Sequence, residues 1–167
     1  VPSWKIQTSI EPLGVLDWPE VYRLMVAREF PNVPATYTEA LPQLARCQLL
    51  GVRGEERWEV VFVIGPADDG VAFLDVVCAV DRVGKWATRA VMGALAEWVF
   101  RDFGLRCVWV QVHSRVALKA ALQAGFTPVT ELDVKAPVLA MTPWMALRLT
   151  GGNKMKTQGG MNDGKYF

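Results

Sequence analysis

The stretch SRVALKAALQAGF at residues 114–126 carries the strongest structural signal in the chain. Ser114 is a residue type that begins helices, and apolar residues recur at helical spacing over 116–123. Gly125 is suited to end that helix, because glycine adopts the left-handed backbone conformation at low cost. Buried-strand patterns flank the helix at 107–112 and 126–134. The stretch therefore predicts a strand, a short helix and a second strand.

The segment before this stretch repeats the same order of elements. Residues 71–80 are apolar except for Asp75, as expected for a central strand covered on both faces. A tight polar loop, DRVGKWAT at 81–88, follows the strand. From 86 to 103 the apolar period becomes that of an amphipathic helix, which Gly104 ends.

The N-terminal part adds two helices and a hairpin. Asp17 is a candidate helix cap, with Pro19 in the first turn. The polar turn 53–57 separates two β-rich runs, which indicates a hairpin. The remaining predicted elements are strands at 4–10, 47–52, 58–64 and within 137–149, and helices at 17–30 and 39–45. This order predicts an α/β fold with a mixed sheet in one domain, residues 1–149, followed by a Gly-rich tail at 150–167.

The composition is that of a globular domain without a dominant charge. The chain has 167 residues, 51% hydrophobic and 21% charged, with a formal net charge of +1. No global field therefore draws it to nucleic acid, and such a partner would need a local basic patch. We expect a cytoplasmic protein, because neither a leader pattern nor an apolar run long enough to span a membrane is visible.

The cysteines and the histidine exclude common metal chemistry. Cys47, Cys78 and Cys107 are odd in number and lie far apart in or beside apolar runs, so we interpret them as buried thiols. With one histidine and no Cys-x-x-Cys pair, we expect no metal site.

Residues 114–126 resemble the late motif of the GNAT N-acetyltransferases, with Ala117, Gly125 and Phe126 at the motif positions. The strand, the loop 81–88 and the following helix look like the acyl-coenzyme A segment of that family. The two motifs stand in the family's order. The resemblance implies a GNAT-like acyl-CoA N-acyltransferase fold. It also implies direct transfer of an acyl group from acetyl-CoA, or another acyl-CoA, to an amine.

The resemblance also implies where the cofactor binds. Backbone groups of three strand residues would contact the pantetheine arm and the acyl carbonyl, and six loop and helix residues would hold the pyrophosphate. Amide hydrogens and the helix dipole at a helix N-terminus suit such an anion. The strand residues are Val76, Val77 and Cys78, and the others are Gly84, Lys85, Trp86, Ala87, Thr88 and Arg89.

The sequence departs from the family at positions that matter for catalysis. Ala72 and Leu74 stand where members often place a general base, and Ala121 replaces the usual tyrosine acid. The bulky Trp86 falls where the backbone approaches phosphate. Two alternatives to the enzyme therefore stay open, namely a GNAT-like binding or assembly module with weak catalysis, and a GNAT-like enzyme that modifies nucleic acid.

His113 and Ser114 are the candidate catalytic residues, because they end a buried strand where open α/β sheets bind ligands. His113 is either a base for the amine or a hydrogen-bonded structural residue. Ser114 either contacts the cofactor sulfur or caps the next helix. Asp75 fits a satisfied buried carboxylate better than a base, since alternation directs it away from the face of Leu74.

The region of the first helix and the following loop shapes the acceptor site in the family. There Tyr37 is our candidate for contact with the acceptor, a small-molecule amine or a protein amine. Some of the seven tryptophans are expected at a pocket or an interface, which leaves a homodimer open.

Overall fold

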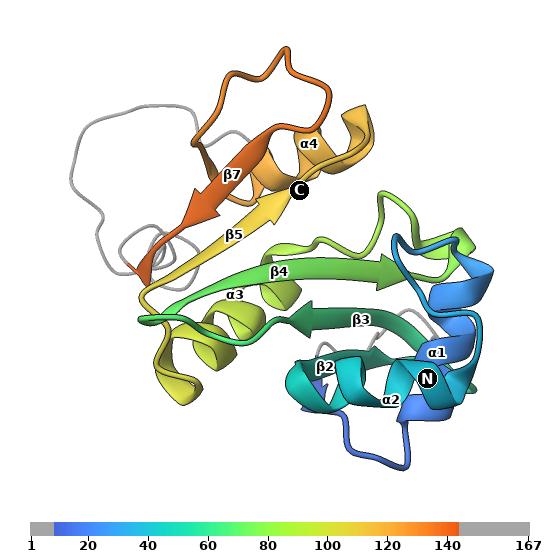
Figure 1. Cartoon of the computed structure of the whole chain (residues 1–167). Coiled ribbons are helices and arrows are strands. Elements are labelled where there is room, and N and C mark those ends of the chain that lie inside the picture. Colours follow the sequence, from blue (N-terminus) through green and yellow to red (C-terminus); the bar gives the residue numbers. More distant parts are fainter. Residues whose placement is uncertain (1–8, 144–167) are drawn as a thin grey trace, which may run out of the picture. The chain divides into compact units, whose positions relative to one another are not determined.

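A computed structural model describes residues 9–143 of the chain (Figure 1). The chain divides into two compact units, of which the first ends at Trp86 and the second begins at Ala87. The tail at 150–167 lies outside the described residues.

The first unit is built on four antiparallel strands in the order β1-β2-β3-β4. Figure 1 shows β2, β3 and β4 side by side. The predicted hairpin is confirmed, with Leu50 of β2 opposite Phe62 of β3. The strands are β1 Ile10–Pro12, β2 Gln48–Arg53, β3 Trp58–Ile64 and β4 Val71–Cys78.

The first strand differs from its prediction. The described strand runs from Ile10 to Pro12, so it extends two residues beyond the predicted end at residue 10. Residues 4–8 of the predicted strand lie outside the described part of the chain.

Helices α1 (Trp18–Ala27) and α2 (Tyr37–Arg46) cover one face of this sheet. Val21 of α1 and Leu44 of α2 share a buried cluster with Val61, Val63 and Val77 of β3 and β4. Burial of such side chains is the main favourable term in folding, at roughly 1.5–3 kcal/mol each. Packing against the sheet therefore fixes both helices.

The helix ends are set by local hydrogen bonds. Asp17 is the N-cap of α1, yet its carboxylate accepts the Gly14 N–H (3.0 Å) and makes no bond to its own helix. Helix α1 ends earlier than predicted, because Glu29 and Asn32 adopt left-handed conformations (φ 51° and 59°). Helix α2 begins two residues earlier than predicted, after the cap Thr36.

The second unit holds α3 and α4 and a three-stranded antiparallel sheet in the order β5-β7-β6. Gly104 and Gly125 follow the two helical segments with φ of 66° and 93°, which confirms their predicted role. The elements are α3 Arg89–Ala96, continued by a π-helix η2 Glu97–Asp102, then β5 Cys107–Gln111, α4 Arg115–Gln123, β6 Thr127–Pro128 and β7 Val138–Met141.

The predicted strand at 126–134 is wrong in its length. Regular ladder pairing with β7 covers Thr127 and Pro128, while the N–H groups of Val129 and Thr130 both donate to the single Val138 carbonyl (2.8 and 3.3 Å). Just beyond them, the Thr130 side-chain oxygen accepts the Val138 N–H (3.0 Å), so a side chain takes the place of a ladder carbonyl. The final strand, Val138–Met141, lies within its predicted range, of which 144–149 lie outside the described residues.

We predict that Gly51→Ala destabilises the first unit. A Cβ at Gly51 would lie 2.7 Å from the ring of Trp58, which is only 3% exposed. The ring cannot retreat easily, because the backbone N–H of Trp58 donates to the Glu20 carboxylate (2.9 Å), which fixes the strand at this residue, and because Arg53 stacks over the ring. We expect a loss of about 1–3 kcal/mol, measured by urea denaturation.

The matched control is Gly14→Ala, where an added Cβ meets nothing within 4 Å. Equal stability of the two variants would contradict the proposed clash.

Candidate functional site

The first unit contains a cavity of about 410 Å³ between its two helices and strands β3 and β4. This volume is within the range of small-molecule sites, roughly 300–1,000 Å³. Most of its wall is apolar, and the apolar side chains include Met25, Phe30, Val33, Leu44 and Phe73.

Phe73 occupies its place on this wall because Gly65 has no side chain. A Cβ at Gly65 would lie 2.0 Å from the Phe73 ring. The Gly65 N–H also donates to the Phe73 carbonyl (3.0 Å), which holds the two backbones together. The glycine thus allows an aromatic ring to form part of the cavity.

Asp75 and Arg46 are the acidic and the basic residue among those that line the cavity. Asp75 lies opposite Val63 of β3, on the sheet face that α1 and α2 cover, as strand alternation predicted. Arg46 stands in the last turn of α2 and is exposed. The sequence did not reveal this cavity. Its wall combines residues of α1 with residues of β4, which lie more than 40 positions later in the chain, and no local sequence pattern links them.

The half-buried thiol of Cys47 also lines the cavity. Burial raises the pKa of this thiol, with nearby Arg46 lowering it by a smaller amount and Asp75 raising it further. The thiol is therefore neutral at pH 7 and adds no charge to the wall.

Tyr37 does not line the cavity but packs behind Tyr22, which does. Its ring contacts that of Tyr22 at 5.7 Å between centroids, and Tyr22 lines the cavity. The Tyr22 hydroxyl donates to the Pro34 carbonyl (2.8 Å), which fixes the loop before α2. Tyr37 therefore supports the wall.

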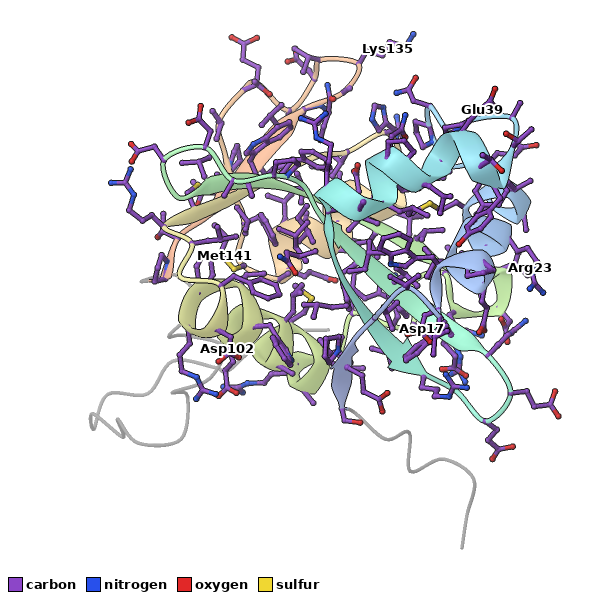
Figure 2. The ribbon with its side chains drawn as sticks, turned by 60° about the horizontal axis from the view of Figure 1, so that its bottom comes forward. Asp17, Arg23, Glu39, Asp102, Lys135 and Met141 are labelled. Atoms are coloured by element: carbon purple, nitrogen blue, oxygen red, sulfur yellow. The ribbon has the colours of Figure 1, made fainter. Side chains whose placement is uncertain are left out.

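The start of α2 is fixed by a capping box. Glu39 completes a capping box with Thr36, through bonds of 3.3 and 3.1 Å between each side chain and the other's N–H. Figure 2 shows Glu39 at the surface at this end of α2. The sequence contained this signal as Thr-x-x-Glu.

The cofactor candidates Val76, Val77 and Cys78 form the last part of β4. They lie opposite Phe62, Val61 and Val60 of β3. In an antiparallel pair, alternate residues direct their N–H and C=O groups toward the partner and away from it. This part of β4 therefore also has backbone groups that point away from β3.

The thiol of Cys78 is unsuited to act as a nucleophile. Burial raises its pKa, Arg28 lowers it by a smaller amount, and Asp81 raises it further. Because the thiolate is the reactive form, the environment of Cys78 favours an inert thiol.

After β4 the chain forms the short helix η1 (Val80–Arg82), which is tied to β3. The Ala79 N–H donates to the Glu59 carbonyl (2.9 Å), and the Arg82 guanidinium pairs with the Glu59 carboxylate (2.6 Å). Arg57 pairs with Asp81 (2.6 Å) at the surface. The Arg82 guanidinium is therefore already paired with a carboxylate of β3.

Some of the backbone N–H groups that we expected to bind the pyrophosphate donate instead to carbonyls of the same turn. The N–H groups of Arg82, Val83 and Lys85 donate to carbonyls of residues 79, 80 and 82. Gly84 is exposed with φ of 73°, a conformation that favours glycine. Lys85 beside it is also exposed.

Trp86 does not begin the following helix, contrary to the prediction. Helix α3 starts at Arg89, because the Thr88 side chain caps it by accepting the Val91 N–H (3.2 Å). The Trp86 ring meets the buried Phe62 of β3 edge-on, with 5.5 Å between centroids. The other N–H groups of the first turn of α3 lack acceptors within the helix.

His113 and Ser114 lie in the second unit, between β5 and α4. The His113 side chain is exposed. The Ser114 hydroxyl accepts the Ala117 N–H (3.1 Å), which confirms the predicted cap. A role of either residue in catalysis stays a prediction.

Candidate membrane-spanning helices and candidate groups of metal ligands are both absent from the described residues. Over residues 9–143, no helix is long and apolar enough to cross a membrane. Within the same residues, His, Cys, Asp and Glu form no group of three or more that could hold a metal ion.

No protein-family model and no curated protein matches the sequence. Solved structures, in contrast, are similar over most of the chain. Spermidine N-acetyltransferase of Vibrio cholerae in complex with CoA and spermine is 12% identical, with a TM-score of 0.67 over 83% of this chain and 97% of that one. RimJ of Mycobacterium smegmatis in complex with CoA-disulfide is 15% identical, with a TM-score of 0.62 over 86% and 88%. A dodecameric structure of the Vibrio cholerae enzyme is 12% identical, with a TM-score of 0.65 over 87% and 98%.

The chain therefore has the α/β fold of the GNAT acetyltransferases, as the resemblance of its sequence implied. At identities of 11–15% the chain is a divergent example of this fold.

We predict that Glu59→Gln loosens the turn after β4. The side chains of Arg82 and Glu59 are only 29% and 14% exposed, and the buried Arg82 Nε has no hydrogen-bond partner in the described structure. Loss of the carboxylate charge leaves the guanidinium poorly compensated, so we expect a cost of about 1–3 kcal/mol. Chemical denaturation measures this cost.

Glu56→Gln, an exposed change in the preceding turn, serves as the control and is expected to stay within about 0.5 kcal/mol of the unaltered chain. A Glu59→Gln variant as stable as this control would show that the pair contributes nothing.

Proposed function

We propose that the chain is an acyl-CoA-dependent N-acyltransferase that transfers an acetyl group from acetyl-CoA directly to an amine. The observation that carries this proposal is the fold, which the chain shares over 83% or more of its length with acetyltransferases solved with CoA or CoA-disulfide. The acyl-CoA segment that the sequence resembles supports the same proposal.

The proposed cofactor contacts are those that the resemblance implied. Backbone groups of Val76, Val77 and Cys78 would bind the pantetheine arm and polarise the acyl carbonyl. The pyrophosphate would be bound by residues 84–89, with Lys85 adding a formal positive charge. The exposure of Gly84 and Lys85 and the capped start of α3 support this assignment.

In the proposed reaction the amine nitrogen attacks the thioester carbonyl carbon. A carbon–nitrogen bond forms, the carbon–sulfur bond breaks, and the CoA thiolate leaves. A base removes one proton from the amine, and the thiolate is protonated in turn. We propose His113 as this base, directly or through water, with Ser114 beside it; the exposure of the imidazole allows access to solvent.

The acceptor is proposed to be a small-molecule or protein amine that reaches the cavity of the first unit. Tyr37 would influence acceptor binding indirectly, because its ring contacts the ring of Tyr22, which lines the cavity. We further propose a cytoplasmic location, where acetyl-CoA is made and the three free cysteines stay reduced. Assembly into a homodimer is proposed by analogy with the oligomeric Vibrio cholerae enzyme.

A binding or assembly module with the same fold is the second candidate. Ala72 and Ala121 are buried residues that cannot move protons, at positions where GNAT enzymes often place a base and an acid. A module of this kind would bind acyl-CoA or a partner without turnover.

We predict that acetyl-CoA binds and that Lys85→Ala weakens its binding roughly tenfold, since the ammonium is expected to pair with a phosphate. Isothermal titration calorimetry measures the affinity. Lys135→Ala is the control, because this lysine is also exposed but lies in the loop before β7, at the surface in Figure 2.

Release of CoA thiol in the presence of amines then separates enzyme from module. Absence of heat and of thermal stabilisation at millimolar acetyl-CoA would refute the transferase proposal. Binding without turnover would favour the module.

We predict that His113→Ala lowers turnover roughly a hundredfold while the affinity for acetyl-CoA stays nearly unchanged. The reason is that the imidazole accepts the amine proton and does not hold the cofactor. The measurement is the pH dependence of kcat, which should lose one limb. An unaltered pH–rate profile in the variant would remove His113 from this role.

A further inference from the structure

We infer that the cavity of the first unit selects an amine with one positive charge and an apolar, preferably aromatic, body, and that it rejects diamines and polyamines. This inference deepens the proposed function and rests on it. It concerns the identity of the acceptor, which the fold leaves open.

The apolar body follows from the size and the wall of the cavity. A volume of about 410 Å³ is enough for a ring and a short side chain, and it lies toward the lower end of the range for small-molecule sites, roughly 300–1,000 Å³. Phe30, Phe73 and Tyr22 supply aromatic surfaces from three separate segments. Burial of apolar area against such surfaces provides the binding free energy.

The single positive charge follows from the charged groups on the wall. Asp75 is the acid among the described lining residues, and its side chain is only partly buried. A carboxylate accepts several hydrogen bonds at once, so it can bind an ammonium in addition to its other contacts. One ammonium is therefore compensated at Asp75.

A second ammonium on the same molecule would be destabilised. Arg46 contributes a positive charge to the same wall, and its guanidinium repels a further cation. The Cys47 thiol is neutral and offers no compensation. A diamine would thus place one charge in an apolar cavity without a partner, which is unfavourable.

This charge balance separates the chain from the Vibrio cholerae enzyme of the same fold, which was solved with spermine. Spermine carries several positive charges. The cavity of this chain has equal numbers of acidic and basic residues among its described lining, one of each.

The test compares benzylamine with p-xylylenediamine, which differ by one aminomethyl group. Binding of each is measured by isothermal titration without cofactor, and acetyl transfer is then measured from acetyl-CoA. We expect the unaltered chain to bind benzylamine at least tenfold more tightly and to acetylate it preferentially.

Two variants and two controls make the test specific. Asp75→Asn is expected to weaken benzylamine roughly tenfold to a hundredfold. Arg46→Glu is expected to raise the affinity for the diamine relative to benzylamine by roughly threefold or more. The exposed Asp68→Asn and Arg23→Glu make the same charge changes at residues that do not line the cavity. Figure 2 shows Arg23 pointing outward from α1.

The inference is overturned if the unaltered chain binds the diamine as tightly as benzylamine, or if Asp75→Asn and its control bind benzylamine equally. Should Asp75→Asn fail to fold, the two amines on the unaltered chain and on Arg46→Glu decide. Failure of the transferase proposal is distinct, because it appears as absent acetyl-CoA binding or absent acetyl transfer, whatever the relative affinities of the two amines.

Discussion

The start of β3 is the constraint on which the first unit depends. The backbone N–H of Trp58 donates to the Glu20 carboxylate of α1, and the Trp58 ring lies against the bare backbone of Gly51 in β2. The next residue, Glu59, accepts the Ala79 N–H with its carbonyl and the Arg82 guanidinium with its carboxylate. Two successive residues thus fix a helix on one side and the turn after β4 on the other. The candidate acceptor cavity and the start of the candidate cofactor loop depend on the same short segment.

The cavity arises where packing between the helices and the sheet is incomplete. Val61 and Val77 lie in the dry cluster under α1 and α2. Farther along the same face, Gly65 lets the Phe73 ring lie across the strand pair, and the loop before α2 is held by Tyr22. Strand alternation then directs Asp75 to this face. Asp75 already has an interaction partner in the structure, and its carboxylate can accept further hydrogen bonds from a cationic ligand.

The sequence predicted what local patterns determine and missed what distant segments build together. Two β-rich runs around a polar turn predicted the β2–β3 hairpin, and glycine positions predicted the ends of the helices before Gly104 and Gly125. The strand after Phe126 was overestimated, because apolar residues alone do not reveal that the Thr130 side chain replaces a ladder carbonyl. The wall of the cavity combines residues from both helices, the loop and two strands, so no single window contained its signal.

The departure of the candidate cofactor loop, residues 81–88, from the family pattern has a structural explanation. A bulky residue at a helix N-terminus would keep phosphate away from the amide hydrogens. In this chain the helix begins three residues after Trp86, behind the cap Thr88, and the Trp86 ring lies against Phe62 of β3. The tryptophan therefore acts as an anchor of the turn, and Gly84 supplies the left-handed residue that the turn requires. A helix start without the usual glycines is consistent with anion binding, because the donors are backbone groups of the first turn and not the side chains before it.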